Sequence, residues 1–144
     1  MMDRPSWMGV LARATEAEIE AALAAAPPLP PHRRVRGPEV GLTMLRGRAG
    51  GDGAAFNLSE ATVARCTVAL EDGTLGHGWR LGRSKRAAEW AAVLDALLQD
   101  EARREEWLAR VVTPLAEAQR AAAAREARRA AATEVRFATL AAMR

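Results

Sequence analysis

Three groups of residues in this sequence have the types and spacing that favour binding of an anion. The first is a basic helix start, where Arg83, Lys85 and Arg86 surround the capping position of a predicted helix. A helix N-terminus already carries unpaired N–H groups and partial positive charge, so three cations there need an acidic group to offset them. That group is either a phosphate or a partner's carboxylate, or an acid of the chain itself such as Glu89 or Asp72.

The second group is the glycine-rich loop Gly47–Gly53, which contains Arg48, Gly50 and Gly51. Glycines allow successive N–H groups to point into one concavity, and such concavities bind phosphate. The loop has neither the Lys-Ser/Thr pair of a P-loop nor the strand-to-helix setting of a dinucleotide site. It is therefore either a loop that contacts a ligand or partner, or a flexible connection.

The third candidate is His77, which lies between two glycines on a predicted strand, where a ligand can approach the backbone closely. The alternative is a histidine whose hydrogen bonds are satisfied at a surface or an interface. Cys66 falls on an apolar strand face beside no base, so we expect a core thiol. One cysteine and two histidines cannot supply the four ligands of a zinc site, and no residues are spaced as an acid–base pair or an activated nucleophile. The sequence thus predicts no catalytic residue and no metal site.

The composition limits the class of protein further. A length of 144 residues suits one domain whose core needs no metal or disulfide. The 21 basic residues, all arginine except Lys85, are interspersed with 18 acidic ones, and no tryptophan alternates with a basic run, which argues against nucleic-acid binding. A single cysteine indicates a reducing compartment. No apolar run approaches the roughly 20 residues of a membrane span, and acids interrupt the apolar stretches of the amino end. We expect a cytoplasmic protein without a membrane partner.

The elements that must position these residues begin with a pair of helices within residues 1–26. Asp3 is a typical N-cap ahead of Pro5, and Thr15 with Glu18 has the spacing of a capping box that starts a second helix. The run PPLPP at 27–31 ends this second helix, because each proline removes a backbone donor.

An antiparallel sheet is predicted within residues 33–81. Apolar residues alternate along Val40–Arg46 and Thr62–Leu70, and a returning strand is expected over Thr74–Leu81. Asp72-Gly73 between the last two strands predicts a two-residue type I′ turn, in which both central residues have positive φ.

Helices are predicted again over residues 84–131. Ser84 caps the first of them, a helical pattern continues over 101–112, and Thr113-Pro114 predicts the N-cap and first-turn proline of a last helix. Residues 133–138 alternate and form a candidate extra strand. The predicted fold class is α+β, with an antiparallel β-sheet of three to four strands flanked by an N-terminal helix pair and C-terminal helices, in one domain over 1–144.

Several short motifs occur in a specific order along the chain. They are Trp7-Met8, Arg48 with Gly50-Gly51-x-Gly53, Asp72-Gly73-Thr74-Leu75-Gly76, Gly82-Arg83, Glu89 and Asp95-Ala96-Leu97. The segments that hold them are RPSWMGVLARA, GLTMLRGRAGGDGAAFNLSEATVARCTVALEDGTLGHGW and GRSKRAAEWAAVLDALLQ. In these segments, and onward through TPLAEAQ to TEVRF, the chain resembles the PhnG family, the G subunits of the bacterial carbon–phosphorus lyase system.

The resemblance implies an accessory subunit in alkylphosphonate catabolism that has no catalytic residue of its own. In that pathway the G, H, I and L subunits together transfer ribose 5-triphosphate from ATP to methylphosphonate and release adenine. The implied partners are the H, I and J subunits of a two-fold core complex, in which copies of this chain can also contact each other, with L added for the transfer. The chain itself is implied to hold no cofactor, since the complex uses ATP and an iron–sulfur cluster is expected on the J subunit.

Two positions depart from the family pattern GRD-x-x-HAE, because this chain has Ser84 for the aspartate and Ala87 for the histidine. The resemblance therefore implies a structural helix start here, without the chemistry of that histidine. A second hypothesis comes from the residues alone. It is a small stand-alone enzyme, or a binding protein for a phosphorylated ligand, that uses Arg48, His77 and Arg83.

Overall fold

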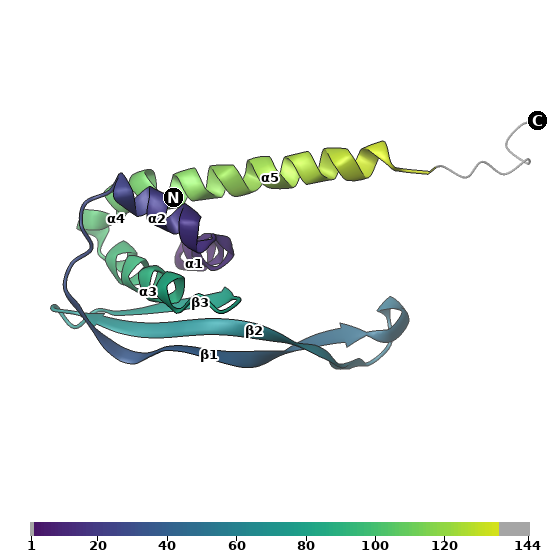
Figure 1. Cartoon of the computed structure of the whole chain (residues 1–144), viewed down its shortest axis with the longest axis horizontal. Helices are drawn as coiled ribbons and strands as arrows, with labels where there is room; N and C mark the ends of the chain where they lie inside the picture. The colour runs from purple at the N-terminus through teal and green to yellow at the C-terminus, as the bar shows by residue number, and fades with distance from the viewer. Residues whose placement is uncertain (1, 136–144) are drawn as a thin grey trace, which may run out of the picture.

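Residues 2–135 are described by the computed structural model, and they form a three-stranded antiparallel sheet with helices on one face only (Figure 1). The strands lie in the order β1-β2-β3 and span His32–Arg48, Ala55–Leu70 and Leu75–Leu81. The helices are α1 (Arg4–Arg13), α2 (Glu16–Ala24), α3 (Lys85–Gln99), α4 (Glu101–Trp107) and α5 (Thr113–Ala132). The predicted α+β class, with an N-terminal helix pair and C-terminal helices around an antiparallel sheet, is confirmed.

The two N-terminal helices begin at the predicted caps. The Asp3 carboxylate accepts a hydrogen bond from the N–H of Ser6 at 3.1 Å, and both bonds of the capping box between Thr15 and Glu18 are present. Each satisfied cap stabilises its helix by roughly 1 kcal/mol relative to alanine. Trp7 is among the side chains that these helices bury in the core.

Helix α3 is the centre of the core, between the sheet and the other helices (Figure 1). It is buried on nearly all sides from Ala87 to Leu98, and the apolar face of β2, which includes Cys66 and Val68, packs against it. Trp90, on the same helix, is only partly buried.

Two glycines allow α3 to lie directly on the backbone of β3. A Cβ atom at Gly76 would overlap the carbonyl oxygen of Ala92, and one at Gly78 would overlap that of Ala88. The chain's own helix α3 therefore fills the space beside these glycines, where the sequence predicted that a ligand can approach the backbone.

The turn between β2 and β3 lies at the predicted place, but the predicted type I′ geometry is wrong. Among the described residues no non-glycine has positive φ, so Asp72 does not, whereas Gly73 has φ 84°. The N–H of Gly73 donates to the carbonyl of Leu70, and the N–H of Leu70 donates to the carbonyl of Thr74. The loop thus has three residues, a turn followed by one left-handed glycine, and only that glycine has to adopt the costly conformation.

Strands β1 and β2 are much longer than the alternation predicted, and together they form a projecting hairpin (Figure 1). Strand β3 pairs only with Val63–Ala69 of β2, so the hairpin continues beyond it as a two-stranded ribbon. We call residues 41–62 the arm. Pro38 lies in a register shift of β1, which is an edge strand and therefore tolerates the missing N–H.

The predicted last helix is present as α5, but the predicted N-cap at Thr113 is wrong. Residues Leu108–Val112 form a π-helical turn, and Thr113 has helical dihedral angles, so the chain stays helical from α4 into α5. The wider turn relieves the clash that Pro114 would make with the carbonyl four residues before it.

Of the candidate strand at 133–138, residues 133–135 form a turn and irregular backbone, and 136–138 lie outside the described residues. None of the described helices is long and apolar enough to cross a bilayer.

Candidate functional site

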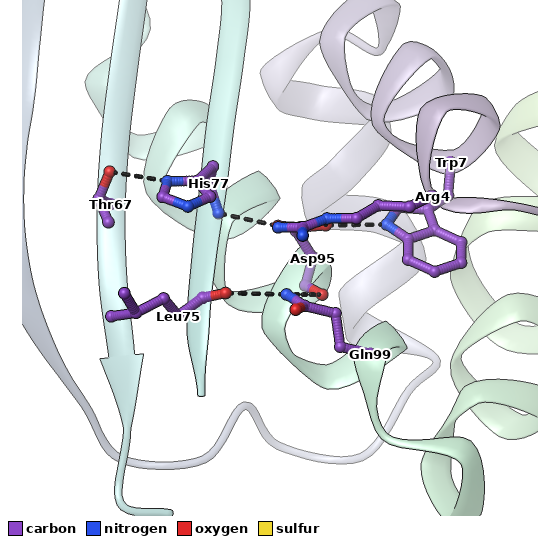
Figure 2. Close-up of polar contacts among 7 residues, drawn as sticks. All are labelled: Arg4, Trp7, Thr67, Leu75, His77, Asp95 and Gln99. Atoms are coloured by element: carbon purple, nitrogen blue, oxygen red, sulfur yellow. Dashed lines mark hydrogen bonds and ion pairs between the residues drawn. The ribbon is translucent and has the colours of Figure 1, made fainter. Parts of the chain in front are cut away.

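A buried carboxylate, Asp95 of α3, is the main polar site of the structure (Figure 2). Its side chain is 0% exposed and accepts four hydrogen bonds. Atom Oδ1 accepts from Nε of Arg4 at 3.1 Å and from Nε1 of Trp7 at 2.9 Å. Atom Oδ2 accepts from Nη2 of Arg4 at 2.8 Å and from the backbone N–H of His77 at 2.9 Å. The carboxylate thereby joins α1, α3 and β3.

Local structure explains why these donors converge on Asp95. Arg4 and Trp7 are three residues apart on α1 and so lie on the same helix face. His77 belongs to an edge strand, whose outward N–H needs a partner, and the two glycines beside it let α3 come close enough to supply one. Gln99, one turn after Asp95, donates to the carbonyl of Leu75 at 2.8 Å and ties the same helix to the start of β3.

The arrangement around Asp95 is suited to holding elements together rather than to acid–base chemistry. An ionised carboxylate offers about four lone-pair positions, and four donors from this chain occupy them. The Asp95 hydrogen bond raises the pKa of the Arg4 guanidinium above its ordinary value, so Arg4 stays positively charged beside the carboxylate. Among the described residues, no buried side-chain polar atom lacks a hydrogen-bond partner.

A second polar cluster joins α3 to β1, and its centre is Glu89. This carboxylate accepts two hydrogen bonds from Arg34, both at 2.8 Å, and lies 3.1 Å from the imidazole of His32. The hydrogen bonds from Arg34 lower the pKa of Glu89, and His32 adds to the effect. Cys66 lies on β2 and is buried, so the predicted core thiol is confirmed. Burial raises the pKa of this thiol to about 11.

The basic helix start is partly neutralised by α2. Ser84 caps α3 through the N–H of Ala87 and donates to Glu16, while Arg86 pairs with Glu20 at 3.1 Å. The guanidinium of Arg86 also lies over the ring of Trp90, 4.4 Å from its centroid. The compensating acids are therefore neither Glu89 nor Asp72, because α2 folds back over this end of α3. Ser84 does the capping that the aspartate of the family pattern would do, and Ala87 is fully buried.

Arg83 and Lys85 differ from Arg86, because both are exposed and neither forms a hydrogen bond or ion pair with any residue in the described range. Of the basic helix start, these two side chains are the ones available to an external anion. No arrangement of three or more histidine, cysteine or acidic residues in this range is suited to a metal ion.

The glycine-rich loop forms the tip of the arm, away from α3 (Figure 1). Gly50 and Gly51 have φ values of 65° and 88°, conformations that favour glycine. Arg48 donates to the carbonyl of Gly53 at 2.9 Å and closes the loop from within.

His77 lies in a third place, in the middle of β3. Its ring points away from α3 and its Nδ1 is 3.1 Å from the hydroxyl of Thr67 (Figure 2). The seven candidate residues therefore occupy the arm tip, the face of β3 away from the helices, and the start of α3, and the structure does not bring these three places together.

Comparison with known proteins identifies the family of this chain. A family model described as phosphonate metabolism protein PhnG matches residues 2–142. The chain belongs to the PhnG family. A curated relative, the alpha-D-ribose 1-methylphosphonate 5-triphosphate synthase subunit PhnG of Rhizobium meliloti (strain 1021), is 50% identical over 101 residues. The match covers 70% of this chain and 65% of the relative's own length.

Proposed function

We propose that this PhnG-family chain is an accessory subunit of an alpha-D-ribose 1-methylphosphonate 5-triphosphate synthase in alkylphosphonate catabolism. In the proposed reaction the bond between ribose C1′ of ATP and adenine breaks, and a bond between C1′ and a phosphonate oxygen forms. The proton that leaves the phosphonate goes to the departing adenine. The H, I and L subunits act in the transfer together with this chain, and the H, I and J subunits form a core complex with it. The relative's 50% identity and its name as a synthase subunit support this assignment.

The observation that carries the role of a subunit is the exposed apolar surface of the arm. Five large apolar side chains there are 45–65% exposed, namely Leu42, Met44, Leu45, Phe56 and Leu58. An isolated two-stranded ribbon is marginally stable in water, and a soluble monomer rarely leaves such a surface uncovered. We therefore expect a partner subunit to cover the arm.

Co-expression of this chain with the H, I and J subunits tests the proposal. The tagged chain should recover all three, and addition of the L subunit, ATP and methylphosphonate should release adenine. Replacing Leu42 and Leu58 with serine should reduce this recovery while leaving the circular dichroism of the chain unchanged, because both side chains are already exposed. The control is Arg103→Ala on α4. Recovery of this chain alone, from cells that contain all of the partners, would contradict the proposal.

A stand-alone enzyme or binding protein for a phosphorylated ligand is the second candidate, favoured by the exposed Arg83 and Lys85 at the start of α3. The purified chain would then release adenine from ATP and methylphosphonate in proportion to its own concentration. We expect no release without the partner subunits. We expect Arg83→Ala to weaken assembly or complex activity while leaving the thermal midpoint of the chain unchanged.

A further inference from the structure

The sheet has a second face that no described helix covers (Figure 1). Side chains on β2 and β3 that alternate with the core residues point to this face, together with their neighbours on β1 in the pairing register. We call it the open face and define it by Arg33, Arg36 and Glu39 of β1, Arg65 and Thr67 of β2, and Leu75, His77, Trp79 and Leu81 of β3. It is distinct from the apolar arm, which lies beyond the end of β3.

The centre of the open face has the composition of a protein interface. Trp79 is 48% exposed, and the apolar side chains of Leu75 and Leu81 flank it along β3 with similar or greater exposure. The guanidinium of Arg65 lies over the Trp79 ring, 5.3 Å from its centroid. Tryptophan and arginine are the residues that most often contribute strongly at interface centres, where partner contacts remove them from water.

The charge of the open face indicates what kind of surface fits it. Glu39 is its one acidic residue, and it already accepts from Arg65 at 2.6 Å and from Arg36 at 3.0 Å. These bonds hold the pKa of Glu39 below its ordinary value, so it stays ionised. Arg33 is exposed and has no ion pair or hydrogen bond with a residue of the described part of the chain. The face therefore has an excess of positive charge around an apolar centre.

This charge also opposes pairing of the face with a second copy of itself. A two-fold contact brings the same patch of both copies together, so the arginines of one copy would face those of the other. Like charges at a contact disfavour that pairing, whereas carboxylates on a different surface would be attracted to it.

We propose that the open face is the docking surface for a partner subunit whose own surface is apolar and bordered by carboxylates. Trp79 inserts into the apolar part of that surface, and Arg33 and Arg36 meet the carboxylates. This inference rests on the proposed role as a synthase subunit and assigns to it a surface and a partner chemistry.

Two variants test the proposal in cells that produce the H, I and J subunits with the tagged chain. Trp79→Ala and Arg33→Glu should each lower recovery of the partners by about tenfold or more, the effect expected of a central interface residue or a reversed charge. Matched controls on the helical layer are Trp90→Ala, which also removes a tryptophan stacked under an arginine, and Arg103→Glu, which also reverses an exposed charge. Arg33 has no described partner to lose, so its variant isolates docking from folding. Circular dichroism of each purified variant checks that it is folded.

Each outcome bears on the proposal separately. The proposal is supported if the two open-face variants recover less of the partners while the two controls do not. It is also supported if high salt lowers recovery by the unmodified chain but has no such effect on Arg33→Glu. Full recovery with both variants overturns the docking surface but leaves the subunit role intact, because the partners still bind. Failure of the unmodified chain to recover any partner overturns the subunit role and the inference together. Dimerisation of the purified chain that Trp79→Ala abolishes, or binding of ATP alone that Arg33→Glu abolishes, would assign the face to a different occupant and overturn the proposal.

Discussion

Replacing Asp95 with asparagine should destabilise the fold by about 2–4 kcal/mol, because it changes one acceptor into a donor at a buried site. The remaining oxygen can still accept from Trp7 and from Nε of Arg4. The new amide group then faces the Nη2 of Arg4 and the N–H of His77, which are both donors. The Arg4 side chain is 41% exposed and can turn to water, but the His77 N–H lies against α3 and is left without an acceptor. That unsatisfied donor, added to the lost ion pair, gives the magnitude.

Urea and thermal unfolding of the purified chain, followed by circular dichroism, measure this effect. For a chain of this size the loss corresponds to a fall in Tm of roughly 5–12 °C. Asp52→Asn makes the same chemical change at an exposed loop position and should shift stability by less than about 0.5 kcal/mol. If Asp95→Asn were equally silent, the argument that the buried carboxylate joins α1, α3 and β3 would be refuted.

Gly78→Ala should cost at least about 3 kcal/mol, because the new methyl group overlaps the backbone of α3, whereas Gly41→Ala meets nothing within 4 Å and should be tolerated; urea midpoints compare the two. Cys66, buried with a pKa of about 11, should react with a thiol reagent near pH 8 only after unfolding, and rapid labelling of the native chain would contradict this assignment. Arg34 lowers the pKa of Glu89 below 4.5, so its stabilising effect is complete above that pH and is lost as the pH falls through the lowered pKa. Arg34→Gln should therefore be less stable at neutral pH and should show a flatter decline on acidification, measured as Tm against pH.

Local signals in the sequence were sufficient where a short segment decides its own conformation. The caps at Asp3, Thr15 and Ser84 each start a helix as predicted, because the side chain and the N–H that it accepts are within three residues. The sequence does not predict the strand ends, because residues 55–61 carry no clean alternation and become extended through pairing with β1. The sequence does not distinguish a capping threonine at position 113 from a helical one, and it carries no local signal for the π-helical turn before it.

The candidate site depended even more on contacts between distant residues. Asp95 was present in a motif of the sequence, and an acid within an apolar helix is a signal of a buried polar role. Its donors, however, are about 90 positions away on α1 and 18 away on β3, so no local spacing connects them. In the same way, the acids that neutralise Arg86 come from α2, which is near it only in the folded chain. Residue types predicted which groups can bind an anion, but tertiary packing decides which of them stay exposed.

The two glycines under α3 also restrict how the sheet can assemble. A shift of β3 by one residue along β2 would turn His77 and Trp79 toward the helix, since neighbouring side chains point to opposite faces of a strand. Only a glycine fits at those positions, because even a Cβ atom there overlaps the backbone of α3. The packing of α3 on β3 is therefore incompatible with a one-residue shift of β3, and this requirement keeps Trp79 oriented away from the core.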